Sequence, residues 1–265
     1  MLSIFEYSFM IRALIAGGVI AIIAPVIGTF LLTKRYSLLA DTLSHVSLAG
    51  VALGFLLGIS PLSTAVFVTV VAAIILEKLR HDQKIPGEAA LAMFLSGGLA
   101  LAVTLISATR GMNINVLSYL FGSIATVQLT DVLIITVLSG FVLLILASFY
   151  KELLYISFDE ETATVSGLPV RLLNVMLMVL TAISVTVSMQ IIGVLLVGAL
   201  MVIPVITATQ IARSFKQIIG YSVIFSVFSV LAGLFISYYL NLAAGGAIVL
   251  LALGIFVLVS IFKNK

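Results

Sequence analysis

Nine long apolar stretches constrain the fold of this 265-residue sequence more than any other feature. A helix needs about 20 mostly apolar residues to cross a bilayer, and most of these stretches are close to that length. Apolar and polar residues do not alternate within them, which predicts helices and excludes barrel strands. We therefore expect an all-α, polytopic transmembrane helical bundle with spans near residues 10–32, 37–58, 61–76, 89–109, 131–149, 171–188, 191–212, 219–239 and 245–262.

The composition excludes several other classes of protein. Apolar residues make up 63% of the chain and charged residues only 9%, whereas soluble domains average about 45–50% and about 25%. A soluble enzyme, a nucleic-acid-binding module and, without any cysteine, a disulfide scaffold are therefore excluded. The sequence has no Walker A motif, so the chain is not expected to be an enzyme that hydrolyses ATP. We expect one domain that covers residues 1–265.

The distribution of Lys and Arg predicts the orientation of the bundle. With nine spans and the N-terminus outside, eleven of these residues fall on the inside, and only Arg12 and Arg110 fall outside. This bias follows the positive-inside rule, so we expect an outer N-terminus, an inner C-terminus and no nucleic-acid partner. The apolar piece at 119–124 is too short to cross. It is re-entrant, interfacial or part of the next span, which leaves eight or nine spans.

Asp41 and His45 are ionisable residues inside the second predicted span. At about 1.5 Å per residue, His45 lies about 13 Å from the inner edge of this span, near the middle of the bilayer. A centrally placed Asp costs about 2.5–3.5 kcal/mol, so a function is expected for it. Residues at i and i+4 share a helix face, and a carboxylate with an imidazole there is half a site for zinc or manganese. Other spans or a second copy would supply more ligands; the alternative is a buried Asp–His hydrogen bond that only packs helices.

Gly50, Gly54 and Gly58 form a ladder of small residues on the same span. Such a ladder allows close approach between helices. Ordinary packing is the favoured interpretation, and a pore-lining or dimer-facing surface is the alternative. The only other histidine, His81, lies in a charged stretch at residues 77–84 and is expected to be a solvated loop residue.

Residues 158–169, with the sequence FDEETATVSGLP, predict a short helix on the inner face. Asp159, Glu160 and Glu161 suit a helix N-terminus, Gly167 suits its end, and the following proline prevents its continuation. A docking helix for a cytosolic partner and a solvated loop are both compatible with this pattern.

The stretch SLLADTLSHVSLAGVALG (37–54) resembles the signature of the permease subunits of bacterial ABC-type zinc and manganese importers. Residues 119–124 and 191–210 resemble further segments of that family, in the same order. Residues 158–169 match the place where these permeases meet their ATPase. The resemblance covers nearly the whole chain.

The resemblance implies a function and a set of partners. It implies a multi-pass permease in the bacterial cell membrane that works with cytosolic ABC ATPase subunits, an extracytoplasmic metal-binding protein and a second permease copy as a homodimer. Asp41 and His45 would handle a transported divalent cation, with no permanently bound cofactor. Residues 158–169 would be the cytoplasmic coupling helix, with ATPase-coupling residues Asp159, Glu160, Glu161, Ala163 and Gly167.

Zinc is the favoured cargo on this resemblance, because Ala40 and Ala49 stand where manganese permeases often carry Gly and Pro. Imidazole also suits zinc. Transport would proceed by alternating access, with ATP hydrolysed by separate subunits. The alternatives are a manganese-selective permease of the same family, a proton-coupled secondary transporter that uses Asp41 and His45, and a membrane scaffold that docks partners through 158–169.

Overall fold

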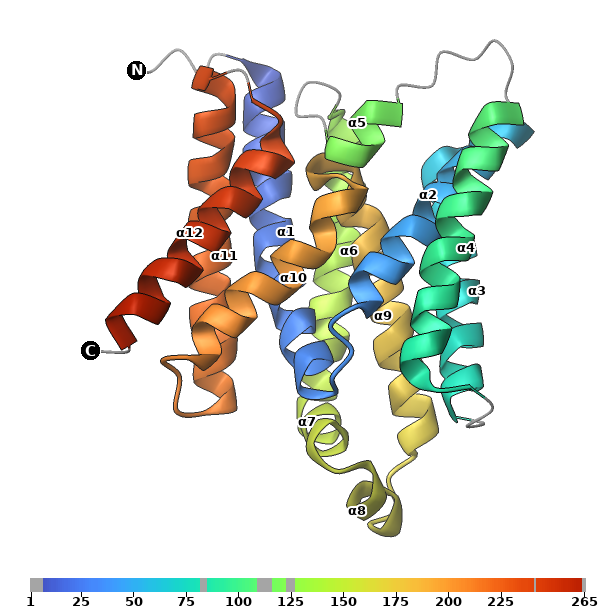
Figure 1. Cartoon of the computed structure of the whole chain (residues 1–265), viewed down its shortest axis with the longest axis vertical. Helices are drawn as coiled ribbons and strands as arrows, with labels where there is room; N and C mark the ends of the chain where they lie inside the picture. The colour runs from blue at the N-terminus through green and yellow to red at the C-terminus, as the bar shows by residue number, and fades with distance from the viewer. Residues whose placement is uncertain (1–6, 82–84, 109–115, 123–126, 241, 264–265) are drawn as a thin grey trace.

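The predicted apolar stretches form helices close to their expected positions. The computed structural model describes residues 7–81, 85–108, 116–122, 127–240 and 242–263 (Figure 1). Within them, eight helices are long and apolar enough to cross a membrane. This confirms the all-α, multi-span fold. The eight are α1 (Ser8–Thr33), α2 (Leu39–Leu57), α3 (Pro61–His81), α4 (Gly87–Ala108), α6 (Leu129–Ser148), α9 (Val170–Ile192), α11 (Phe215–Leu240) and α12 (Ala244–Lys263).

The seventh apolar stretch, at residues 191–212, forms a shorter helix, α10 (Val194–Thr209), of 16 residues. Only Gly193 separates it from α9, with a φ of +93°, a region that favours glycine. A Cβ atom at this position would lie 2.5 Å from both the Gly122 nitrogen and the Leu120 oxygen. Both the backbone conformation and the close contact therefore require glycine, and the break between α9 and α10 is fixed at this residue.

The apolar piece at 119–124 is only partly helical in the described residues. Its first three residues end the short helix α5 (Val116–Phe121). The ring of Tyr119 packs edge-on against Phe55 of α2, with 6.1 Å between the ring centroids. Residues 109–115 and 123–126 lie outside the described residues. They include Arg110, one of the two basic residues predicted to lie outside.

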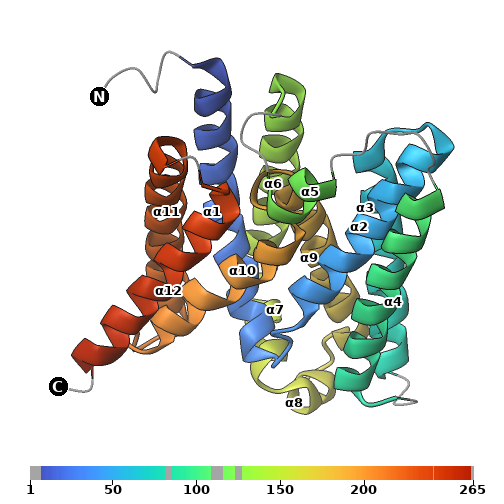
Figure 2. The ribbon, with the colours of Figure 1, turned by 45° about the horizontal axis from the view of Figure 1, so that its top comes forward.

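Burial separates the helices into a core and a periphery. In the most apolar window of α1, α2 and α9, 67%, 72% and 72% of the residues are buried, whereas α3, α4, α6, α11 and α12 have 33% or less. Figure 1 shows α3 and α4 beside α2 on one side, α11 and α12 on the other, and α1, α6, α9 and α10 between them. Figure 2 shows the same order from a second direction. The helix that carries Asp41 and His45 is therefore part of the core.

Two short helices, α7 (Tyr150–Phe158) and α8 (Glu160–Val165), extend beyond one end of the bundle (Figure 1). Phe215 of α11 packs against Phe30 of α1 and Phe158 of α7, with centroid distances of 5.3 and 6.0 Å. This aromatic cluster attaches α7 to the two long helices. We call this end of the bundle the α8 end.

Two predicted boundaries differ from the structure. Residues 158–169 do not form a single helix, because Phe158 ends α7 and only Glu160–Val165 are helical beyond it. The third span does not end at residue 76, and its helix continues to His81. The buried Glu77 receives two hydrogen bonds from Arg80 at i+3, and this pairing supports a further helical turn despite its charge.

Candidate functional site

Asp41 and His45 lie one turn apart on α2 and are each partly accessible, whereas Leu43, Ser44 and Val46 between and beside them are buried. The i, i+4 spacing places both side chains on one helix face, as predicted. The helix therefore presents a carboxylate and an imidazole from within the core of the bundle.

Glycines of two neighbouring helices make room for this pair. A Cβ atom at Gly198 of α10 would overlap the Asp41 carboxylate. A Cβ atom at Gly98 of α4 would lie 2.9 Å from the backbone nitrogen of Val46 and 3.1 Å from the carbonyl carbon of His45. The segment that carries the two ionisable residues is thus held closely between α4 and α10.

The His45 imidazole has a free nitrogen. Its Nδ1 atom is buried and has no hydrogen-bond partner among the residues that the structure describes. No hydrogen bond or ion pair joins Asp41 to His45 in this structure. A buried nitrogen without a hydrogen bond costs free energy, so such an atom needs an explanation. Coordination of a cation by His45 Nδ1 would satisfy this atom.

The hydroxyl groups next to Asp41 and His45 donate hydrogen bonds to backbone oxygens of their own helix turn. Ser44 Oγ donates to the backbone oxygen of Asp41 at 2.8 Å, and Thr42 Oγ1 donates to the backbone oxygen of Leu38 at 2.9 Å. No cluster of three or more His, Cys, Asp or Glu side chains suited to a metal occurs in the described part of the chain. Asp41 and His45 are thus the two candidate metal ligands that this structure places on one helix face.

The three glycines of α2 have two different roles. Cβ atoms at Gly50 and Gly54 would lie 2.6 Å from Ala65 Cα and 2.8 Å from Pro61 Cα, so both glycines pack directly against α3. Gly58 contacts nothing in this way, and its φ of +66° makes it the left-handed cap of α2. Within this chain Gly58 therefore ends α2, whereas Gly50 and Gly54 make the close helix contacts.

The segment around α8 is a capped helix of six residues. The Asp159 carboxylate accepts hydrogen bonds from the backbone nitrogen of Thr162 at 3.0 Å and from its hydroxyl, and these bonds lower the pKa of Asp159. Gly167 ends the turn with a φ of +82°, and the Leu168 nitrogen donates to the oxygen of the fully buried Ala163. Glu161 is exposed.

Glu160 faces the bundle and contacts three of its helices. Its Oε1 atom accepts a hydrogen bond from Lys34 Nζ at 2.7 Å and from Asn174 Nδ2 at 3.2 Å, and lies 3.5 Å from Arg80 Nη2. Burial raises the pKa of Glu160, but the hydrogen bond from Lys34 and the charges of Lys34 and Arg80 outweigh it and leave the pKa lowered. Burial likewise lowers the pKa of Lys34, and Glu160 partly offsets this effect.

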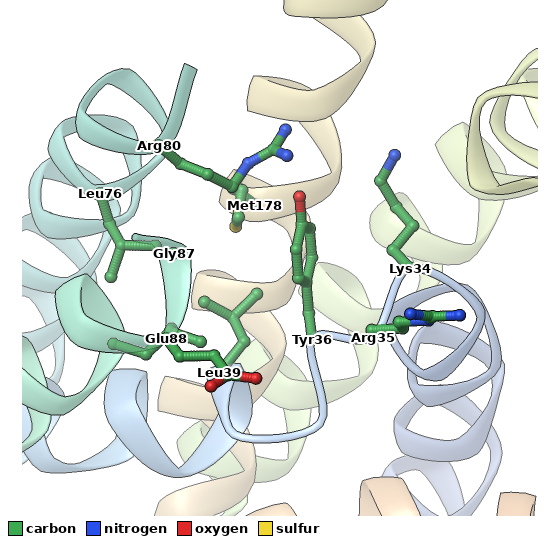
Figure 3. A pocket seen from close by; sticks show the side chains of 10 residues that line it. Lys34, Arg35, Tyr36, Leu39, Leu76, Arg80, Gly87, Glu88 and Met178 are labelled. Carbon is green, nitrogen blue, oxygen red and sulfur yellow. The ribbon is translucent and has the colours of Figure 1, made fainter. Parts of the chain in front are cut away.

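Sequence analysis did not single out Lys34, Tyr36, Glu77 or Arg80. Lys34, Tyr36 and Arg80 line a pocket of about 270 Å³ at the α8 end (Figure 3), and Glu77 accepts two hydrogen bonds from Arg80. The Arg80 guanidinium lies 5.0 Å from the centre of the Tyr36 ring. The only sequence signal for this cluster is that its charged residues lie at the ends of predicted spans. Charged residues at span ends are usually solvated, so this signal did not single them out. His81 is exposed as predicted, although it belongs to α3 and not to a loop.

The eight apolar helices define a multi-pass membrane protein. Residues 6–263 match the ABC 3 transport family, and the chain belongs to this family. It is 37% identical to the manganese import system permease protein ScaB of Streptococcus gordonii, over 97% of this chain and 92% of that protein. It is 31% identical to the high-affinity zinc uptake system membrane protein ZnuB of Haemophilus influenzae, over 98% and 99%.

A solved structure has the same fold. The structure titled PsaBC from Streptococcus pneumoniae in complex with Fab matches with a TM-score of 0.87 and 35% identity, over 97% of this chain and 92% of that one. The family match confirms the resemblance on which the transport prediction rests. It also favours a subunit of an ABC importer over the proton-coupled transporter and the membrane scaffold.

Proposed function

We propose that this chain is the membrane-spanning subunit of an ATP-driven zinc importer. The observation that carries the proposal is the pair on α2: a partly accessible Asp41 carboxylate one turn from a His45 imidazole whose Nδ1 is buried and unpaired. Carboxylate oxygen and imidazole nitrogen both ligate divalent transition metals, and imidazole suits zinc. The two residues would bind the cation briefly on its way through the bundle.

A transport site must release its cargo, and two ligands from one chain suit this need. A structural zinc site usually has four protein ligands, whereas an incomplete site leaves positions open for water. A second copy of the chain would add another Asp41 and His45. We therefore propose a homodimer in which the metal is a substrate and not a resident cofactor.

Energy for transport would come from separate subunits. We propose that a cytosolic ATPase contacts α8, and that an extracytoplasmic binding protein delivers the metal at the opposite end of the bundle. ATP binding and hydrolysis would then alternate the access of the Asp41–His45 site between the two sides. The N-terminus would lie outside and the C-terminus inside, as the distribution of Lys and Arg predicts.

Manganese is the second candidate cargo. The 37% identity to a manganese permease supports it, compared with 31% to a zinc permease. Carboxylate and water ligands also suit manganese. The two metals are therefore compared directly in the test.

Uptake of radiolabelled zinc and manganese tests the proposal. The chain would be expressed with its ATPase and binding protein in cells that lack high-affinity uptake of both metals. We expect ATPase-dependent zinc uptake that His45→Ala abolishes and that His81→Ala, at the chain's only other histidine, leaves intact. Uptake without the ATPase, or equal uptake by His45→Ala, would contradict the proposal, and uptake of manganese alone would correct the cargo.

A further inference from the structure

Glu160 joins α8 to three helices through one carboxylate oxygen. Lys34 follows the last residue of α1, Arg80 lies in the last turn of α3, and Asn174 lies in α9. All three polar groups meet Glu160 Oε1, at 2.7, 3.5 and 3.2 Å respectively. A displacement of α8 therefore acts on α1, α3 and α9 together.

The partners of Glu160 are themselves held in place. Arg80 donates two hydrogen bonds to the fully buried Glu77, at 2.9 and 2.8 Å, and its guanidinium lies against the Tyr36 ring. The side chain of Lys34 is only 3% exposed and also donates to the backbone oxygen of Ile156 in α7 at 3.0 Å. Partly buried, charge-assisted contacts of this kind are stronger and less screened than surface ion pairs.

Two routes lead from these contacts to the metal-site helix. The first is the connection from α1 to α2, which is short and hydrogen-bonded: the Tyr36 nitrogen donates to the Leu31 oxygen at 2.8 Å, and the Leu39 nitrogen donates to the Tyr36 oxygen at 3.0 Å. Asp41 follows in the first turn of α2. The second route is α3, which packs against α2 at Gly50 and Gly54.

We propose that Glu160 is a positioning residue for transport: it makes α1, α3 and α9 follow the movement of α8 and so transmits that movement to Asp41 and His45. The inference rests on the proposed function, in which an ATPase moves α8. The network contains two carboxylates, Glu77 and Glu160, and two cations, Lys34 and Arg80, so it is neutral as a whole. Replacing Glu160 by Gln keeps the shape of the side chain but removes the charge that holds Lys34 and Arg80.

The ratio of metal transported to ATP hydrolysed tests this role. The complete complex, with permease, ATPase and binding protein, would be reconstituted in liposomes with radiolabelled zinc or manganese. For Glu160→Gln we expect the ratio to fall about tenfold, the factor that a lost charge-assisted hydrogen bond contributes to an equilibrium, while ATP hydrolysis continues. Glu152→Gln in α7 is the matched control, since Glu152 has no ion pair among the described residues, and its ratio should equal that of the wild type.

A second variant, together with the yield and melting temperature of the complex, distinguishes a role of Glu160 in positioning the helices from a role in folding. Asn174→Ala removes the link to α9 but leaves the two cations, so we expect a smaller fall in the same ratio. If Glu160→Gln lowers only the yield or the melting temperature of the complex and keeps the wild-type ratio, Glu160 is structural and the inference is wrong. If the wild-type complex hydrolyses ATP without any metal uptake, the proposed function itself fails, and the inference fails with it.

Discussion

The carboxylate of Asp41 on α2 lies directly against the backbone of Gly198 on α10, where no side chain larger than hydrogen fits. These residues are 157 positions apart in the sequence. The contact makes α10 one wall of the candidate metal site. Movement of α10 relative to α2 would therefore change the space around the carboxylate.

Substitution of Gly198 tests this contact. A methyl group there must displace the Asp41 carboxylate or push α10 away, so we expect Gly198→Ala to lower metal uptake at least about tenfold, as small misplacements of functional groups often do. Gly140→Ala in α6 is the matched control, because no atom lies within 4 Å of its added methyl group. Radiolabelled uptake at equal expression measures the effect, and equal uptake by the two variants would show that the Asp41 position is unimportant.

Gly97 and Gly98 are adjacent on α4, but only Gly98 packs against α2, so alanine substitutions at the two positions can be compared directly. A Cβ at Gly98 would press on the backbone of His45 and Val46, whereas a Cβ at Gly97 meets no atom within 4 Å. We expect Gly98→Ala to destabilise the protein by about 1–3 kcal/mol, the usual cost of overpacking. Gly97→Ala should be neutral or slightly stabilising. Thermal unfolding in detergent distinguishes them, and the reverse order would contradict the packing of α2 against α4.

Substitution of Gly50 tests the contact between α2 and α3 in the same way. Its added methyl group would lie 2.6 Å from the Ala65 Cα atom, which is backbone and cannot rotate away. We expect Gly50→Ala to cost about 1–3 kcal/mol. Gly18→Ala in α1, in open space, is the control. Equal melting temperatures for the two variants would mean that α3 does not pack closely on α2.

The attachment of α8 to the bundle should weaken at acidic pH. The pKa values of Glu160 and Asp159 are lowered from their ordinary values of 4.5 and 3.8, so their contribution to stability is present above these values. It is lost as the pH falls below them and the carboxylates are protonated. The groups that face Glu160 are Lys34, Arg80 and Asn174, and both cations stay charged over this acidic range.

Hydrogen exchange of residues 160–165 measures this effect, after correction for the intrinsic exchange rate. Protection should fall between about pH 6 and about pH 3 in the wild type and should change less in Glu160→Gln. Protection that is constant over this range in the wild type would contradict the role of the two carboxylates.

Sequence patterns predicted the helices well because lipid imposes a simple rule on length and polarity. They failed where a local contact overrides hydropathy. Glu77 looks like the start of a loop, but its pairing with Arg80 keeps α3 helical to His81. Gly193 breaks a continuous apolar stretch, and hydropathy has no signal for a break between two apolar helices.

The candidate site was partly predictable for the same reason. Asp41 and His45 stand out because ionisable residues are rare in a span. Gly198 and Glu160 depend on tertiary contacts: Gly198 is one small residue among many in an apolar helix, and Glu160 is one of three consecutive acidic residues. Only the fold shows that Glu160 faces Lys34 and Arg80 while Glu161 is exposed.

The most direct test of the central claim is metal binding by the purified permease–ATPase complex, held without nucleotide. Titration with zinc, followed by calorimetry, should give a binding signal in the wild type and in His81→Ala. The signal should weaken at least about a hundredfold in His45→Ala and in Asp41→Ala, because each substitution removes one of the two proposed ligands from every copy, and even the loss of a residue that only orients a ligand costs about 10–100-fold in metal affinity. Unchanged zinc affinity in His45→Ala would contradict the assignment of the metal site to α2.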